Sequence, residues 1–126
     1  MSIAHLVVAL VAVAANAFSG YAAITRLPAI MKTLGPALET AGVPESWLVF
    51  PIGTLKLAGA TGIAIGLLGV PVIGVAAAVG IVAFFVCATY THVRVSDFSP
   101  QFYLACCFFL PVAIATLALD LANPIR

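Results

Sequence analysis

The sequence predicts an all-α integral membrane protein, a bundle of four transmembrane helices with a short interfacial segment between the first two. The composition and the length of the apolar runs both lead to this fold class. Apolar residues make up 64% of the 126 residues, charged residues make up 7%, and the mean hydropathy is +1.26. A soluble domain carries about a quarter charged residues. So few charges cannot cover a globule in water, and we treat residues 1–126 as one membrane domain.

Four apolar runs are long enough to cross a bilayer, at about residues 3–24, 47–68, 70–90 and 102–119. Each has roughly the 20 residues that a helix needs to cross about 30 Å of hydrocarbon. In lipid the backbone must satisfy its own hydrogen bonds, so the runs are predicted to be helices rather than strands. No Lys or Arg precedes the first run, which is longer than a signal-peptide core, so we expect it to be a retained span.

The connections between the runs differ in length. Residues 68–71, Leu-Gly-Val-Pro, form a tight reversal, so the second and third runs are expected to make an antiparallel hairpin. Residues 91–101 form a short polar connection before the last run. The longest connection, residues 25–46, has apolar residues at helical spacing between Lys32 and Glu39, which favours one or two short amphipathic helices in the interface. An irregular loop is the alternative.

Glycines of the second run, Gly59, Gly62 and Gly66, recur at intervals of three and four residues. Small residues at this spacing let helix backbones approach closely in lipid. The pattern has two interpretations: packing inside the monomer, or a glycine-rich face for self-association or for another membrane protein. The predicted partners are therefore the lipid bilayer and, through the glycine-rich face, either another membrane protein or a second copy of this chain.

Several other functions are disfavoured by the sequence. A net charge of +1 gives no reason to expect nucleic acid as a partner. The cysteines Cys87, Cys106 and Cys107 lie inside apolar stretches without metal-site spacing, so we interpret them as small packing residues. No second His or carboxylate follows or precedes His92 at the sequence spacing of a metal site, and His5 belongs to the opposite face of the membrane. No metal or haem is therefore predicted.

The distribution of Lys and Arg gives an orientation. With four spans both termini lie on one side, and the connections 25–46 and 91–101 lie on the other. The connections hold Arg26, Lys32 and Arg94, whereas the terminal side holds only Arg126. The positive-inside rule therefore predicts that the connections are cytoplasmic and the termini lie on the opposite side.

One charged residue lies well inside a predicted span. Lys56 is about 14 Å along a helix axis from Trp47, and a lysine in the membrane costs several kcal/mol unless it is paired, hydrated or neutral. Its polar neighbours by depth are expected to be Asn16, Ser19, Cys87 and Tyr90. The carboxylates expected to reach it are Glu39, Glu45 and Asp97. Lys56 either extends to the interface or belongs to a polar cluster in a functional pocket.

His92 follows the third run in a polar stretch that also holds Arg94 and Asp97. It can be an interfacial histidine that bonds water or lipid headgroups. Alternatively, His92, Arg94 and Asp97 join Arg26 and Lys56 around a pocket mouth on the side of the long connection.

The order and spacing of several short motifs resemble those of the DoxX-like membrane proteins. The resemblance runs from about Phe18 to Asp97. It rests on Phe18-Ser19-Gly20, Arg26-Leu27, Gly53-Thr54-Leu55-Lys56-Leu57-Ala58-Gly59-Ala60, Gly62 with Gly66, and Ala88 with Thr91-His92-Val93-Arg94.

This resemblance implies the four-helix layout and places the polar signatures of the family on Ser19, Gly20, Arg26, Lys56, His92 and Arg94. In relatives the position of Arg26 is often lysine and that of Lys56 is often glutamate. The family name derives from a subunit of a thiosulfate:quinone oxidoreductase, and other members resemble membrane partners or chaperones. The resemblance therefore implies a fold more strongly than an activity.

The sequence leaves the function open between two main hypotheses. The first is an accessory, scaffold or chaperone-type subunit that binds another membrane protein, since no nucleophile–base pair, metal cluster or phosphate loop is visible. The alternative is an intramembrane oxidoreductase, isomerase or cyclase acting on a quinone, an isoprenoid or an epoxide. Transport is a third, less favoured hypothesis, because no broken helix pair is visible.

In the enzyme hypothesis the catalytic candidates are Lys56, His92 and Asp97. Lys56 or Arg26 would hold an oxygen, and His92 with Asp97 or Tyr90 would move protons. The substrate-binding candidates are Asn16, Ser19, Arg26, Tyr90 and Arg94. No cofactor is predicted beyond a quinone that such a pocket could accept.

Overall fold

The computed structural model describes residues 2–122, and these residues are helical with short connections and no strands. Four stretches are long and apolar enough to cross a membrane, as the sequence predicts. They are Ile3–Thr25, Glu45–Leu67, Pro71–Arg94 and Pro100–Ala122. The predicted fold class is confirmed.

The first and third stretches are continuous α-helices, α1 (Ile3–Thr25) and α4 (Pro71–Arg94). Helix α4 continues past the predicted end at residue 90, so part of the polar stretch 91–101 is helical. Pro71 opens α4 at a first-turn position, where a missing backbone N–H costs nothing. The predicted boundaries were thus too short at the polar end, where residues that suit a connection still continue the helix.

The second and fourth stretches are interrupted. The second begins with η1 (Glu45–Leu48) and a wider turn, η2 (Val49–Gly53), and becomes regular in α3 (Thr54–Leu67). Phe50 has extended backbone angles, φ −144° and ψ 130°, so the helix is broken there. The fourth stretch consists of α5 (Pro100–Leu104), a π-helical turn η3 (Ala105–Phe109) and α6 (Leu110–Ala122).

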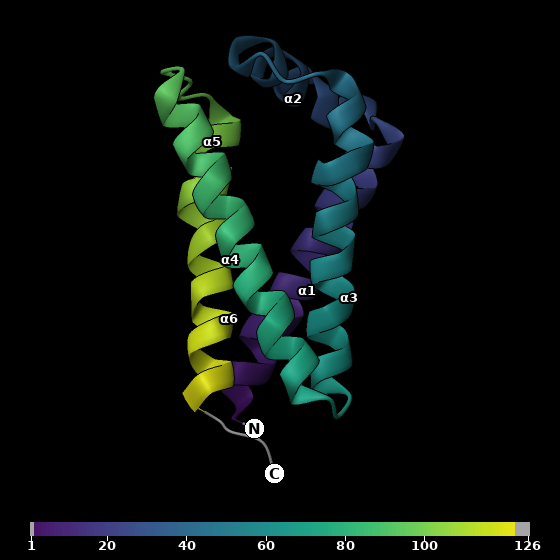
Figure 1. Ribbon diagram of the computed structural model, residues 1–126, viewed down its shortest axis with the longest axis vertical. Coiled ribbons are helices and arrows are strands. Elements are labelled where there is room, and N and C mark those ends of the chain that lie inside the picture. Colours follow the sequence, from purple (N-terminus) through teal and green to yellow (C-terminus); the bar gives the residue numbers. More distant parts are fainter. Residues whose placement is uncertain (1, 123–126) are drawn as a thin grey trace.

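The long connection contains a single helix, α2 (Pro28–Ala41), so the amphipathic interpretation is confirmed and the irregular loop is excluded. Its Ala37 and Leu38 are buried, while Lys32 and Glu39 are exposed. The helix ends at Gly42, whose φ of 71° is in the left-handed region that glycine adopts without strain. In Figure 1, α2 lies across one end of the bundle, near α5.

The spans form an antiparallel bundle in which α1 and α4 each pack against α3 and α6. Figure 1 shows the first turn of α1 and the last turn of α6 at the same end, opposite α2. This agrees with the prediction that both ends of the chain share a side. Arg126, which the charge count used, lies outside the described residues.

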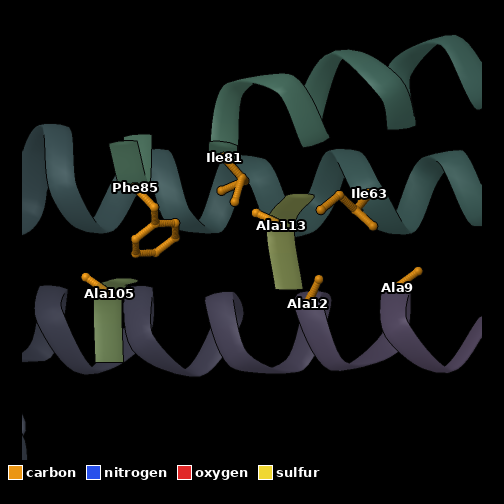
Figure 2. Close-up of a cluster of buried hydrophobic side chains, with 7 residues drawn as sticks. All are labelled: Ala9, Ala12, Ile63, Ile81, Phe85, Ala105 and Ala113. Atoms are coloured by element: carbon orange, nitrogen blue, oxygen red, sulfur yellow. The ribbon is translucent and has the colours of Figure 1, made fainter. Parts of the chain in front are cut away.

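A core of small and medium side chains fills the bundle between these helices. Figure 2 shows residues from α1, α3, α4, η3 and α6 converging on one another, with alanines facing larger side chains. The buried members are Ala9, Ala12, Ile63, Ile81, Phe85, Ala105 and Ala113. A second cluster, Ala23, Leu38 and Leu48, lies under α2 and attaches it to α1 and η1. The first cluster thus packs the four spans together, and the second adds α2 to them.

The glycines of α3 pack against α4 of the same chain. A Cβ on Gly62 would meet Ala77 at 2.5 Å, a Cβ on Gly66 would meet the backbone of Gly74 at 2.6 Å, and Gly59 faces Ile81 equally closely. The interpretation of these glycines as internal packing residues is therefore confirmed. Their contacts leave this face no room for a second protein.

We predict that Gly66→Ala destabilises the protein, by about 1–3 kcal/mol, because the added methyl must separate α3 from α4. Gly80→Ala is the matched control, since a Cβ there would meet nothing within 4 Å and alanine favours helix. Thermal unfolding in detergent measures both variants. Equal melting temperatures for the two variants would contradict the close α3–α4 contact.

Candidate ligand cavity

A cavity of about 730 Å³ lies between the helices, on the α2 side of the core. Its walls come from residues within 15–22, 30–43, 47–56, 80–92 and 101–109, and most of them are apolar. The polar side chains that line it are few, namely Ser19, Lys56, Thr91, His92 and Gln101. Small-molecule sites in proteins typically measure about 300–1,000 Å³ and combine apolar walls with few polar groups. The cavity therefore has the size and lining of a site for one lipophilic molecule.

Lys56 stands in the first turn of α3, just after the helix break, and its side chain is partly buried. Its Nζ donates a hydrogen bond to Ser19 Oγ on α1, 2.7 Å away. The ring centroids of Phe84, Phe85 and Phe109 lie 5.5–5.7 Å from the same nitrogen. Aromatic faces attract a cation at this distance. The ammonium group therefore lies among aromatic rings at the cavity wall, and the polar-cluster interpretation describes it better than extension to the interface.

The prediction that a carboxylate of the connections pairs with Lys56 is wrong. Glu45 lies 3.6 Å from the guanidinium of Arg26, Asp97 lies 3.0 Å from His92, and Glu39 is exposed on α2. Each of the first two acids has a basic partner close to it at the end of a helix. Within residues 2–122, Lys56 makes no ion pair. Among these residues its contacts are the Ser19 hydroxyl and three aromatic rings.

His92 and Asp97 form a second polar group at the α4–α5 connection. The Asp97 carboxylate accepts from His92 Nδ1 at 3.0 Å and from the backbone N–H of Ser99 at 3.1 Å. The backbone N–H of Asp97 in turn donates to the carbonyl of His92 at 2.8 Å. Burial alone would raise the pKa of the Asp97 carboxyl, but hydrogen bonds from Ser99 and His92 hold the pKa below its usual value. Asp97 is thus an ionised group that orients the imidazole.

A third polar contact joins α2 to α5. The amide of Gln101 donates to Thr33 Oγ1 at 2.8 Å, and Gln101 also lines the cavity. The contact holds the helix that covers this end of the bundle against the start of the fourth span.

The remaining predicted site residues lie outside the cavity lining. Arg26, Tyr90 and Arg94 are exposed, and Tyr90 and Arg94 are four positions apart on α4, so they share a face that points away from the cavity. Asn16 is fully buried, and its Nδ2 donates to the carbonyl of Ala12 at 2.9 Å. None of these four residues therefore lines the cavity together with Lys56 and His92.

Sequence reasoning missed the aromatic surroundings of Lys56. Phe84-Phe85 and Phe108-Phe109 are aromatic pairs inside apolar runs, and nothing in such runs marks which ring faces a cation. The roles of Thr33 and Gln101 were also missed, since their contact joins residues far apart in the chain. His5 is placed as expected, at the opposite end, where it pairs with Asp120 and joins α1 to α6.

The fold and the cavity define a class, that of small multi-pass membrane proteins built as a helical bundle around a lipophilic cavity. A sequence model of the DoxX-like family matches residues 7–117. The chain therefore belongs to the DoxX-like family. Comparison with curated proteins and with solved structures found no match.

We predict that Asp97→Asn lowers the free energy of unfolding by about 2 kcal/mol at neutral pH, because the ionised acceptor of two hydrogen bonds is lost. The native pKa of Asp97 is depressed, so its stabilisation is present above the unfolded-state pKa and lost as pH falls through the native pKa. The difference between the two proteins should therefore shrink in acid.

Thermal unfolding in detergent over a series of pH values measures this difference. Glu39→Gln, which neutralises an exposed carboxylate on α2, is the control and should leave the curve unchanged. A gap that stays constant from neutral to strongly acidic pH would refute the role given to the ionised carboxylate.

Proposed function

We propose that this DoxX-like protein binds a lipophilic molecule in the cavity and holds an oxygen of that molecule with Lys56 and Ser19. The observation that carries the proposal is the Lys56 ammonium group, which faces an apolar cavity without a carboxylate partner among the described residues. Quinones, oxygenated isoprenoids and epoxides combine an apolar body with such an oxygen.

The energetics of Lys56 support a ligand oxygen as its missing partner. A charged lysine at the centre of a membrane helix costs about 3 kcal/mol on insertion scales. A cation–π contact returns about 0.5–2 kcal/mol, and a single hydroxyl satisfies one of three N–H donors of an ammonium group. A carbonyl or anionic oxygen would satisfy another donor and offset part of the remaining cost. The site thus favours a ligand with an exposed oxygen over a pure hydrocarbon.

The accessory-subunit hypothesis drew part of its support from glycine faces that suit docking of another helix. Gly59, Gly62 and Gly66 are instead occupied by α4. That function, the proposed partner protein and self-association stay predictions that these glycines do not support. The cytoplasmic orientation of α2 and the α4–α5 connection also stays a proposal, based on the excess of Lys and Arg at this end.

We predict that Lys56→Met weakens binding of a lipophilic quinone at least tenfold, because the variant keeps the apolar volume and loses the N–H donors. The single tryptophan, Trp47, lines the cavity and provides the measurement. Decylubiquinone should quench Trp47 fluorescence saturably when the protein is reconstituted in nanodiscs.

Tyr90→Phe is the matched control for this titration, since Tyr90 is exposed on α4 outside the cavity lining. Its saturation curve should equal that of the wild type. Equal affinity in Lys56→Met, or quenching that rises without saturation, would refute the proposal. Stoichiometric co-purification of another membrane protein in mild detergent, without a bound small molecule, would favour the accessory function.

A further inference from the structure

His92 has one ring nitrogen that its structural contacts do not use. Nδ1 bonds Asp97, and within residues 2–122 no hydrogen-bond partner is found for Nε2. A carboxylate accepts hydrogen bonds only, so in the neutral imidazole Nδ1 carries the proton and Nε2 has a free lone pair. Since His92 also lines the cavity, the structure gives this site a base that Asp97 orients.

Lys56 and His92 line the same cavity but are too far apart to contact the same atom of a bound ligand. Lys56 Nζ lies beside Phe84 and Phe85 on α4, whereas His92 is seven residues beyond Phe85 on that helix. At 1.5 Å per residue the imidazole is roughly 10 Å further along the axis. A ligand that contacts both groups must carry two polar atoms at opposite ends of a rigid unit.

We propose that His92, positioned by Asp97, exchanges a proton with a hydroxyl group of the bound ligand. The ligand class is an aromatic or quinonoid ring whose hydroxyl faces His92 and whose conjugated carbonyl oxygen, on the other side of the ring, faces Lys56. This inference rests on the proposed function and adds a proton transfer at the end of the cavity that His92 lines.

The proton transfer needs no further reactant. The ligand O–H bond breaks, its electron pair stays on the ligand, and the proton forms an N–H bond at His92 Nε2. Conjugation carries the negative charge to the carbonyl oxygen of the ligand, where Lys56 stabilises it. The Asp97 carboxylate stabilises the imidazolium. The reverse transfer returns the proton. The net charge of the complex is unchanged at each stage.

The charged groups near His92 fit this assignment. Asp97 contacts the imidazole directly, and Lys56 lies across the cavity. Arg94 on α4 and the α2 residues Lys32 and Glu39 are exposed, while Phe102, which packs its ring against His92, carries no charge. Asp97 is therefore the acid that contacts the imidazole directly.

A 4-hydroxyphenyl nonyl ketone is a suitable probe, since its ultraviolet band moves to longer wavelength when the phenol ionises and its ketone is conjugated to the phenol oxygen. The probe is added to the full chain in nanodiscs at a pH below its free pKa, in weak buffer with a pH indicator. We expect saturable binding, a phenolate band, and little proton release to the medium, because His92 retains the proton.

Variants separate this inference from the proposed function. His92→Gln should bind the probe and lose at least nine-tenths of the phenolate band, Asp97→Asn should show a reduced band, and Tyr90→Phe should match the wild type. A phenolate band of unchanged size in His92→Gln, or one proton released for each probe bound to the wild type, overturns proton exchange. If the probe binds equally well to Lys56→Met, the proposed function itself is wrong.

Discussion

The close contact between α3 and α4 at Gly66 and Gly74 determines the shape of the rest of the bundle. Without side chains at these positions the two backbones meet near the 68–71 turn. Further along the same helices the residues between them are larger, and Lys56 with Phe84 and Phe85 stands at the cavity wall. A hairpin that is closed by glycine at one end and kept apart by large side chains at the other leaves space beside it, which α1, α2 and the fourth span also line. The cavity follows from this gradient in side-chain size.

The same arrangement explains why irregular backbone is tolerated in the second span. A broken helix exposed to lipid would leave N–H and C=O groups without partners, at a cost of several kcal/mol each. Here Phe50 is exposed, but the segment η2 that contains the break packs against α1, and Pro51 and Ile52 line the cavity. Gly53 fits against the backbone of Gly20, so α1 approaches the break closely. The interruption places Lys56 at the start of a regular helix, with its side chain directed to Ser19.

The fold could be predicted from the sequence because length and hydropathy alone determine the spans in lipid. The site could be predicted only in part. Lys56 stood out because a cation inside an apolar run needs an explanation, and Ser19 followed from depth. Its three candidate carboxylates included Asp97, but the tight turn after α4 pairs this acid with His92 instead. Tyr90 was assigned to the pocket from its depth and Arg94 from its place beside His92. The sequence does not show which face of α4 each residue occupies, and both are exposed.

The separation between the two polar groups limits the chemistry that the cavity can support. An enzyme that enolises a ketone needs its base and its oxyanion donor within a few ångströms of one carbonyl group. Lys56 on α3 lies level with Phe85 of α4, and His92 is seven residues further along α4, so the two groups are too far apart for that arrangement. They suit a conjugated ring instead, because conjugation links charge at one end to a proton at the other. His92 lies beside the α4–α5 connection and the exposed Arg94, whereas the Lys56 ammonium group lies among aromatic rings.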